Sequence, residues 1–422
     1  MNILKHLIIT AALALPAAAA AADGLTLTWD QARKLALENN PAVKAARASM
    51  EQAGYNYQAS LNSYLPQVSA SHAVSRSGGD GSSPSNRWSA SLSASQELLN
   101  LRTVSTIKTS RIAKEKAEAD YLAASASARQ ALAGAFADLL FAQRRADVQK
   151  KIYGIRQENA KLIRLKYESG MESKGNALYT EALAESAAVS VKKAGRDLAS
   201  AQRALLEAIG LESASGAAAV GDLAVPEFSL DEAAVSAALE RSPRIVAAKK
   251  TLESAGERVS SARYYAYPSL KANGSYGWSG EREFPDNKSW SMGLSLSLPL
   301  FSGGPTYHFD NLAAYKKALA AAEQDYRAAR LALASSLRSG YDSYLSAADT
   351  ARAAVSLLAA NEERYKEAQI KYMAGKISFI DLENVERNFV DSDLNQLDYA
   401  RSAHSRKQAL EQLLGVPMER QD

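Results

Sequence analysis

The chain has 422 residues, and its 50 basic and 46 acidic residues give a formal charge of +4 at pH 7 without any basic block. This balance does not suggest a nucleic-acid partner. The sequence contains no cysteine, which excludes disulfides, thiol chemistry and a lipid-modified N-terminal cysteine. The four histidines are scattered and no nucleophile, base and acid occur in a recognisable pattern, so we expect no metal, no cofactor and no enzymatic activity.

The N-terminus has the pattern of a secretory signal peptide. Lys5 and His6 precede an apolar run from Leu7 to Leu15, and a tract of alanines ends at Ala22. The apolar centre is too short for a membrane-spanning helix, which needs about 20 residues, and small residues suit a cleavage site. We expect residues 1–22 to be removed. No later stretch has the length of a membrane-spanning helix, so an exported chain would enter a bilayer only as a closed β-barrel.

The rest of the chain is an internal duplication. Trp88 and Trp290 match at a separation of 202 residues, and Glu181 and Glu386 match at a separation of 205. A repeat of this length predicts two similar structural units. We assign them to residues 23–211 and 230–416, with a polar linker at 212–229 and a tail at 417–422.

Each half has the pattern of a helix, two strands and two long helices. Residues 29–64 favour a helix, which Pro66 ends. Alternating apolar residues predict strands at about 67–76 and 88–98, and at about 269–278 and 290–299, joined by polar loops at 77–87 and 279–289. Runs of about ten residues with aromatic ends are typical of outer-membrane strands.

Long helices are predicted after each hairpin. Residues 101–167 and 306–372 contain no proline and almost no glycine, and each would be about 100 Å long at 1.5 Å per residue. Alanine-rich positions spaced four and three residues apart, such as Ala347, Ala351 and Ala354, are typical of coiled-coil seams. The fold class is therefore mainly α with a small β part, built from a duplicated helix-hairpin-helix-helix unit.

Four strands per chain cannot close a membrane barrel, for which about eight is the usual minimum. A dimer would give eight strands around an interior filled by side chains, whereas a trimer would give twelve strands and room for a passage. We therefore expect a homotrimer in which the long helices extend the passage beyond the membrane lipid.

Several motifs resemble the TolC family of outer-membrane efflux and secretion channels. They are the Leu298-Pro299-Leu300-Phe301-Ser302-Gly303-Gly304 turn, the repeated Lys-Tyr-x-x-Gly turns at 166–170 and 371–375, and the helix lengths. The first copy has no glycine pair at 98–102. The resemblance implies a trimeric 12-stranded β-barrel in the outer membrane, continued by a long periplasmic α-helical barrel. The chain would be the passive exit duct of a tripartite efflux or type I secretion system. Its partners would be a periplasmic adaptor (membrane fusion) protein and an inner-membrane pump such as an RND or ABC transporter.

The resemblance also assigns functions to the helical turns at 168–176 and 373–381, which would be the periplasmic tips. Asp381 matches a lumenal acidic position at the pore constriction, Asn384 matches a second such position without the acid, and Tyr372 matches a tyrosine in the links that hold the tip closed. The adaptor-docking positions would be Gly170, Met171, Ser173, Gly375, Lys376 and Ser378.

Simpler interpretations of these residues stay open. Asp381, three residues after Ser378, could simply cap the next helix and have no role in the pore. Tyr372 could be an ordinary aromatic residue of the coiled-coil seam. Glycines often end helices without any partner protein. For the whole chain, the main alternative is a periplasmic or surface coiled-coil scaffold without transport. Such a scaffold would be extracted without detergent, whereas a barrel would stay in the outer membrane.

Overall fold

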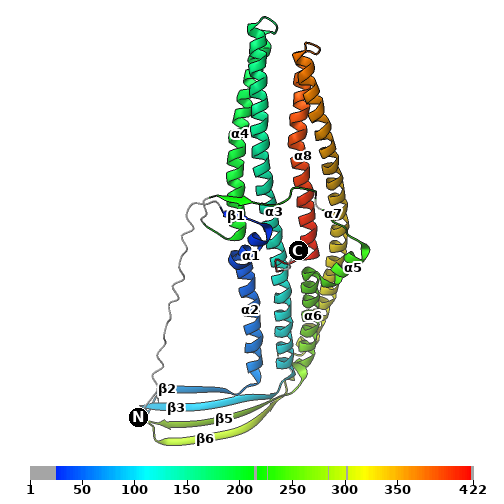
Figure 1. Cartoon of the computed structure of the whole chain (residues 1–422). Helices are drawn as coiled ribbons and strands as arrows, with labels where there is room; N and C mark the ends of the chain where they lie inside the picture. The colour runs from blue at the N-terminus through cyan, green and yellow to red at the C-terminus, as the bar shows by residue number, and fades with distance from the viewer. Residues whose placement is uncertain (1–24, 213–215, 226, 284, 301–302, 420–422) are drawn as a thin grey trace.

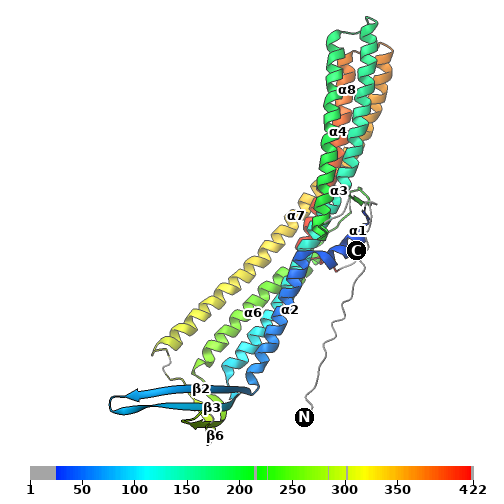
Figure 2. The same ribbon diagram turned by 90° about the vertical axis from the view of Figure 1, so that its left-hand side faces the viewer.

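The computed structural model describes residues 25–212, 216–225, 227–283, 285–300 and 303–419. The predicted signal peptide lies outside these residues, as do Phe301 and Ser302 of the glycine-containing turn. The molecule is long and narrow, with a sheet at one end, a layer of short elements in the middle and two helical hairpins at the other end (Figures 1 and 2). Within the described part of the chain, no helix is both long and apolar enough to cross a membrane.

The two halves contain similar elements in the same order. The first half consists of β1 (Leu25–Leu27), α1 (Trp29–Asn39), α2 (Pro41–Leu61), the 3-10 turn η1 (Asn62–Tyr64), β2 (Gln67–Gly79), β3 (Ser82–Leu99), α3 (Leu101–Glu168) and α4 (Lys174–Ile209). The second consists of β4 (Ala217–Ala219), α5 (Glu232–Arg241), α6 (Pro243–Arg263), the 3-10 turn η2 (Tyr264–Ala266), β5 (Ser269–Gly280), β6 (Asn287–Ser297), α7 (Tyr307–Met373) and α8 (Phe379–Leu414).

The predicted loop at 77–87 is wrong, because β2 continues to Gly79 and β3 begins at Ser82. A turn with Gly81 at φ 85° reverses the chain, so the alternating residues on both sides can keep pairing. The predicted loop at 279–289 is also too long, since the second hairpin opens only between Gly280 and Asn287. Its last strand ends at Ser297, before Pro299, which has no N–H for a strand hydrogen bond.

The four long strands form one antiparallel sheet in the order β2-β3-β5-β6. One face is apolar and open, and it carries exposed Trp290, Met292 and Leu294 on β6. The other face is rich in serine, and hydroxyl pairs such as Ser71 with Ser91, 2.8 Å apart, connect its strands. The sheet therefore has one face suited to lipid and one suited to water. Its edge strands β2 and β6 each have an outer side that pairs with no other strand in the described part of the chain.

The predicted single helix at 29–64 is divided into α1, α2 and a 3-10 turn. Asn40 leaves the helical conformation with ψ 122°, and its Oδ1 accepts a hydrogen bond from the Ala42 N–H at 2.9 Å, so that it caps α2. Pro41 then occupies the first helical position, where it needs no N–H partner. Ser242 and Pro243 divide α5 from α6 at the matching place in the second half.

The predicted linker is partly ordered as a strand. Its β4 pairs in parallel with β1, with Leu25 opposite Ala217. The short elements cover a core that includes Leu132, Leu205 and Met418, so the C-terminal tail also packs against the first half. Gly415 ends α8 at φ 75°, and a Cβ there would lie 2.3 Å from Cδ of Pro243, so only glycine fits this contact.

The long helices confirm the predicted lengths, with 68 residues in α3 and 67 in α7, or about 100 Å each. α3 pairs with α4, α7 pairs with α8, and α3 also packs against α8. Towards the tips the four helices are therefore ordered α4, α3, α8, α7 (Figure 1). The outer sides of α4 and α7 are the two edges of this layer.

Candidate functional site

The two turns at the tips have the same backbone design. Gly170 has φ 74° and Gly375 has φ 69°, and the next residue in each turn donates its N–H to a carbonyl five residues back, from Met171 to Lys166 and from Lys376 to Lys371, both at 2.8 Å. This is the helix-ending arrangement that requires a left-handed residue. It exposes Met171 and Lys376 at the end of the molecule.

The helices that leave these turns are capped by serine. The Ser173 Oγ accepts a hydrogen bond from the Asn176 N–H at 3.1 Å, and Ser378 does the same for Asp381 at 3.2 Å. The Asp381 carboxylate in return accepts from the Ser378 hydroxyl at 2.7 Å and the Ser378 N–H at 3.1 Å. Asp381 therefore forms a capping box.

The capping role does not hide the charge of Asp381. Its side chain is exposed, and the hydrogen bonds from the Ser378 hydroxyl and N–H hold the pKa of its carboxyl below the ordinary value. Asn384 lies one turn further along α8 and is also exposed, and its Oδ1 accepts a hydrogen bond from Arg387 at 3.3 Å. The end of the second hairpin thus presents one ionised carboxylate and one neutral amide at these two positions.

Tyr372 connects the two tips. It is only 3 % exposed, and its hydroxyl donates to the Glu172 carboxylate at 2.7 Å, while Lys166 Nζ lies 3.9 Å from the centre of its ring. Burial and the hydrogen bond to Glu172 raise the pKa of Tyr372. Burial acts to raise the pKa of Glu172, but hydrogen bonds from Tyr372, Asn176 and Ser173 outweigh it and lower that pKa. Tyr372 is therefore both a buried seam residue and a polar link.

Sequence reasoning missed Glu172. It occupies the repeat position that Ile377 occupies in the second half, and this difference between otherwise similar turns was the signal that could have identified it. Both turns line one hollow of about 330 Å³, which brings together the predicted residues Met171, Tyr372, Gly375 and Ser378. Gly170, Ser173, Lys376, Asp381 and Asn384 lie outside its lining.

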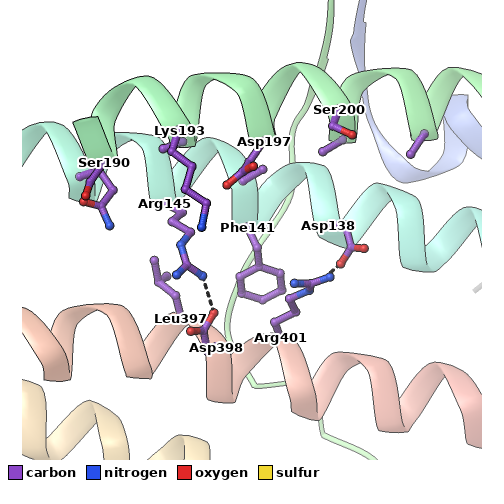
Figure 3. A pocket seen from close by; sticks show the side chains of 15 residues that line it. Asp138, Phe141, Arg145, Ser190, Lys193, Asp197, Ser200, Leu397, Asp398 and Arg401 are labelled. Atoms are coloured by element: carbon purple, nitrogen blue, oxygen red, sulfur yellow. Dashed lines mark hydrogen bonds and ion pairs between the residues drawn. The ribbon is translucent and has the colours of Figure 1, made fainter. Parts of the chain in front are cut away.

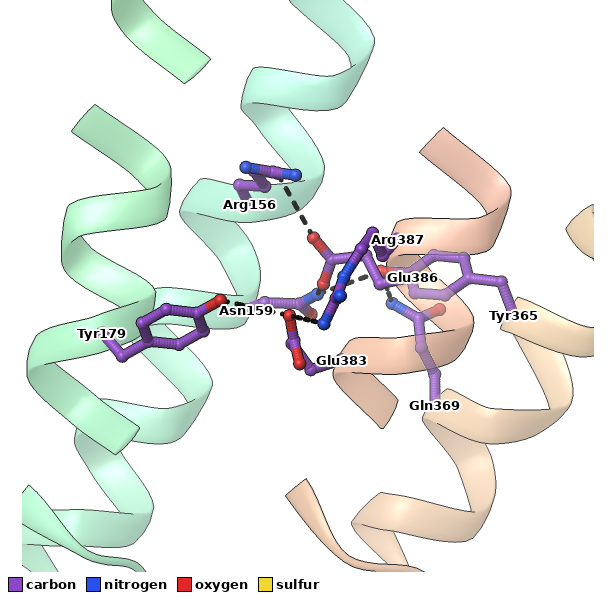
Figure 4. A network of polar contacts seen from close by, with 8 residues as sticks. All are labelled: Arg156, Asn159, Tyr179, Tyr365, Gln369, Glu383, Glu386 and Arg387. Carbon is purple, nitrogen blue, oxygen red and sulfur yellow. Dashed lines mark hydrogen bonds and ion pairs between the residues drawn. The ribbon is translucent and has the colours of Figure 1, made fainter. Parts of the chain in front are cut away.

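A buried polar network lies between the hairpins behind the tips (Figure 4). Glu386 of α8 accepts a hydrogen bond from Asn159 of α3 and lies 3.5 Å from the Arg156 guanidinium, while Asn159 also donates to the Tyr365 hydroxyl at 3.1 Å. Burial raises the pKa of Glu386, although Asn159 and Arg156 oppose the shift. Burial likewise raises the pKa of Tyr365. The network joins the two hairpins of one chain.

A larger polar groove of about 540 Å³ lies between α3, α4 and α8 (Figure 3). Two ion pairs cross it from α3 to α8, Arg145 with Asp398 at 2.8 Å and Arg401 with Asp138 at 2.7 Å. These four side chains are about half exposed, so each pair adds little stability. The part of the lining that the structure describes holds no histidine or cysteine, and we assign it no chemistry.

The described residues contain no cluster of three or more His, Cys, Asp or Glu side chains that could hold a metal ion. The features that remain are an amphipathic sheet at one end and a polar, turn-built tip at the other, connected by long helices. Such an arrangement suits a conduit subunit.

Residues 32–211 and 234–416 both match the model of the outer membrane efflux protein family, and the chain belongs to this family. It is similar to the outer membrane protein TolC of Vibrio cholerae, with 24% identity over 436 residues, 97% of this chain and 95% of the relative. Its fold is similar to two solved outer membrane channels. That of Campylobacter jejuni CmeC has a TM-score of 0.81 and 20% identity over 93% of this chain and 87% of the other. The open state of Neisseria gonorrhoeae MtrE has a TM-score of 0.81 and 22% identity over 92% and 88%.

Proposed function

We propose that the protein is the outer-membrane exit duct of a tripartite efflux or type I secretion system, with the first 22 residues removed on export. The observation that carries this proposal is the sheet, which has an open apolar face, a serine-rich face and two free edges. Lipid would cover the apolar face and water would fill the other. Substrates would pass along the polar face without any catalytic step.

The free edges support a closed homotrimer. A four-stranded sheet must satisfy the unpaired N–H and C=O groups of β2 and β6 before it can cross a bilayer. Three sheets joined edge to edge provide twelve strands, enough for a barrel with a passage. The same three-fold assembly would join α7 of one subunit to α4 of the next and continue the passage as a tube of helices.

The tips would form the periplasmic gate. In a trimer three Asp381 carboxylates lie around one axis, and their lowered pKa keeps them charged at neutral pH. A ring of like charges in a narrow opening attracts cations and repels anions. The Tyr372 to Glu172 hydrogen bond would hold the two hairpins of each subunit together when the gate is closed. The exposed turns with Met171 and Lys376 would meet the periplasmic adaptor, which connects the duct to the inner-membrane pump.

Extraction and mass together test this proposal. The protein should remain in the outer membrane after washing with high salt and alkali, and in detergent it should have three times the mass of the chain. Deletion of residues 68–94 together with residues 270–296 should release a helical, water-soluble product, because both hairpins of the apolar sheet face would be lost. Extraction of the intact protein without detergent would instead support the coiled-coil scaffold, and a stable monomer would contradict the duct.

A further inference from the structure

The contact between α3 and α8 within one chain has a mixed apolar and polar character. Ile152 of α3 is 3 % exposed and packs in a cluster with Val390 of α8, and the partly buried Leu394 joins this cluster. Asn159 and Glu386 form the hydrogen bond at the centre of the polar network nearby. At this level of the molecule, the contact between two hairpins thus consists of an apolar cluster and a buried polar pair.

The duplication places the same positions on the two edges of the layer. Ile152 and Leu394 match Leu357 of α7 and Val189 of α4 at the 205-residue separation. Leu357 is 57 % exposed and Val189 is 61 % exposed. Positions that are buried or partly buried between α3 and α8 are therefore exposed on the outer sides of α7 and α4. In the described chain, α3 and α8 pack against each other, whereas the outer sides of α7 and α4 have no such neighbour.

The polar pair is also repeated, but with a change of charge. At the same separation, Glu386 matches Glu181 of α4, and Asn159 matches Arg364 of α7. Glu181 keeps a partner within its own hairpin, since Arg164 lies 2.9 Å from its carboxylate. Arg364 is exposed, and no ion pair is found for it among the described residues. The edge positions thus hold a carboxylate and a guanidinium where the internal interface holds a carboxylate and an amide. Within the chain the positive partner of Glu386 is Arg156, 3.5 Å away and three residues before Asn159 in α3.

We infer that Glu181 of one subunit forms an ion pair with Arg364 of the partner subunit. Closure of the layer joins an α4 edge to an α7 edge, and α4 matches α8 while α7 matches α3. The contact between subunits then repeats the contact within the chain, with Leu357 and Val189 as its apolar part. This inference rests on the homotrimer of the proposed function, in which the partner at each helical edge is a second copy of this chain.

Crosslinking tests the inference, and the absence of cysteine from the sequence makes introduced thiols unambiguous. The double variant Glu181→Cys with Arg364→Cys, treated in membranes with a short bis-maleimide, should give covalently linked dimers and trimers. Neither single variant should do so. The matched control is Asn159→Cys with Glu386→Cys, the equivalent pair, which should link within one chain and leave its mass on a denaturing gel unchanged.

A second measurement separates the inference from the trimer itself. Native mass of each double variant shows whether the trimer forms. If the native mass shows a trimer but the Glu181 and Arg364 double variant gives no covalently linked dimers or trimers, the inference is overturned and the proposed duct stands. Absence of the trimer in the parent protein overturns both. In the charge-reversal series, Arg364→Glu should lower the temperature at which the trimer dissociates, and adding Glu181→Lys should restore it.

Discussion

Removal of Asn159 tests the polar network between the hairpins. Asn159→Ala deletes the donor to the Glu386 carboxylate and to the Tyr365 hydroxyl. Tyr365 keeps a hydrogen bond from Gln369 at 2.7 Å, but among the described residues Glu386 keeps only Arg156 at 3.5 Å. Because the Glu386 side chain is 10% exposed, a buried carboxylate would lose a direct partner, which costs about 1–3 kcal/mol.

The pH dependence of this loss follows from the raised pKa of Glu386. A carboxyl whose folded pKa lies above its usual 4.5 stabilises the fold at low pH and loses that contribution as pH rises through the folded pKa. Asn159 reduces the loss, since it stabilises the charged form. The Asn159→Ala deficit should therefore be largest at pH 8 and shrink as the pH falls towards 4.5.

Thermal melting of the helical circular dichroism signal in detergent is the assay. Asn159→Ala should lower the melting temperature by about 1–4 °C at pH 8 for a chain of this size. Lys161→Ala, at an exposed position of the same helix turn, is the matched control and should change stability by less than about 0.5 kcal/mol. An equal deficit at all pH values, or none, would refute the assigned coupling between Asn159 and the charged Glu386.

Three further predictions concern the tip and the closure of the second half. Tyr372→Phe removes the hydrogen bond between the tips, and Glu172→Gln weakens it. Either variant should increase single-channel conductance. Unchanged currents would show that this link does not close the gate. Asp381→Asn should keep the helix cap, because asparagine caps well. It should reduce both the cation selectivity of the pore and its block by multivalent cations added on the periplasmic side. If both properties persist, Asp381 is only a helix cap. Gly415→Ala should destabilise the protein by more than about 1 kcal/mol, since it adds a Cβ at a positive φ against Pro243. The control Gly54→Ala, in open space within α2, should stabilise the protein by about 0.5–1 kcal/mol. Equal melting temperatures for the Gly415 and Gly54 variants would contradict the close contact between Gly415 and Pro243.

Periodic and local features of the fold could be predicted from the sequence. Alternation in the strands and the uninterrupted helices at 101–167 and 306–372 depend on neighbouring residues, so the patterns were visible. The pairing of β1 with β4 was not, because three-residue strands carry almost no periodic signal and form only when distant segments meet. The extent of the first hairpin was underestimated because its Gly/Ser-rich sequence at 77–87 has few apolar residues.

The candidate site shows the same division. The helix caps at Ser173 and Ser378 follow from local sequence. The contact between Tyr372 and Glu172 depends on how two turns 200 residues apart pack together. The bond from Asn159 to Glu386 likewise depends on the packing of α3 against α8, and helical periodicity describes one helix at a time. Such contacts need the tertiary arrangement, although the repeat did mark Glu386 as the counterpart of Glu181.

Ion conduction by the purified protein tests the central claim most directly. The detergent-solubilised trimer would be inserted into a planar bilayer, and current recorded for the parent and for Tyr372→Phe. A water-filled duct predicts discrete conductance steps for both proteins, with larger steps for the variant because its tip link is weakened. Trimers that insert into the bilayer, as verified by their protection from protease, yet conduct no ions in either form would contradict the proposed duct.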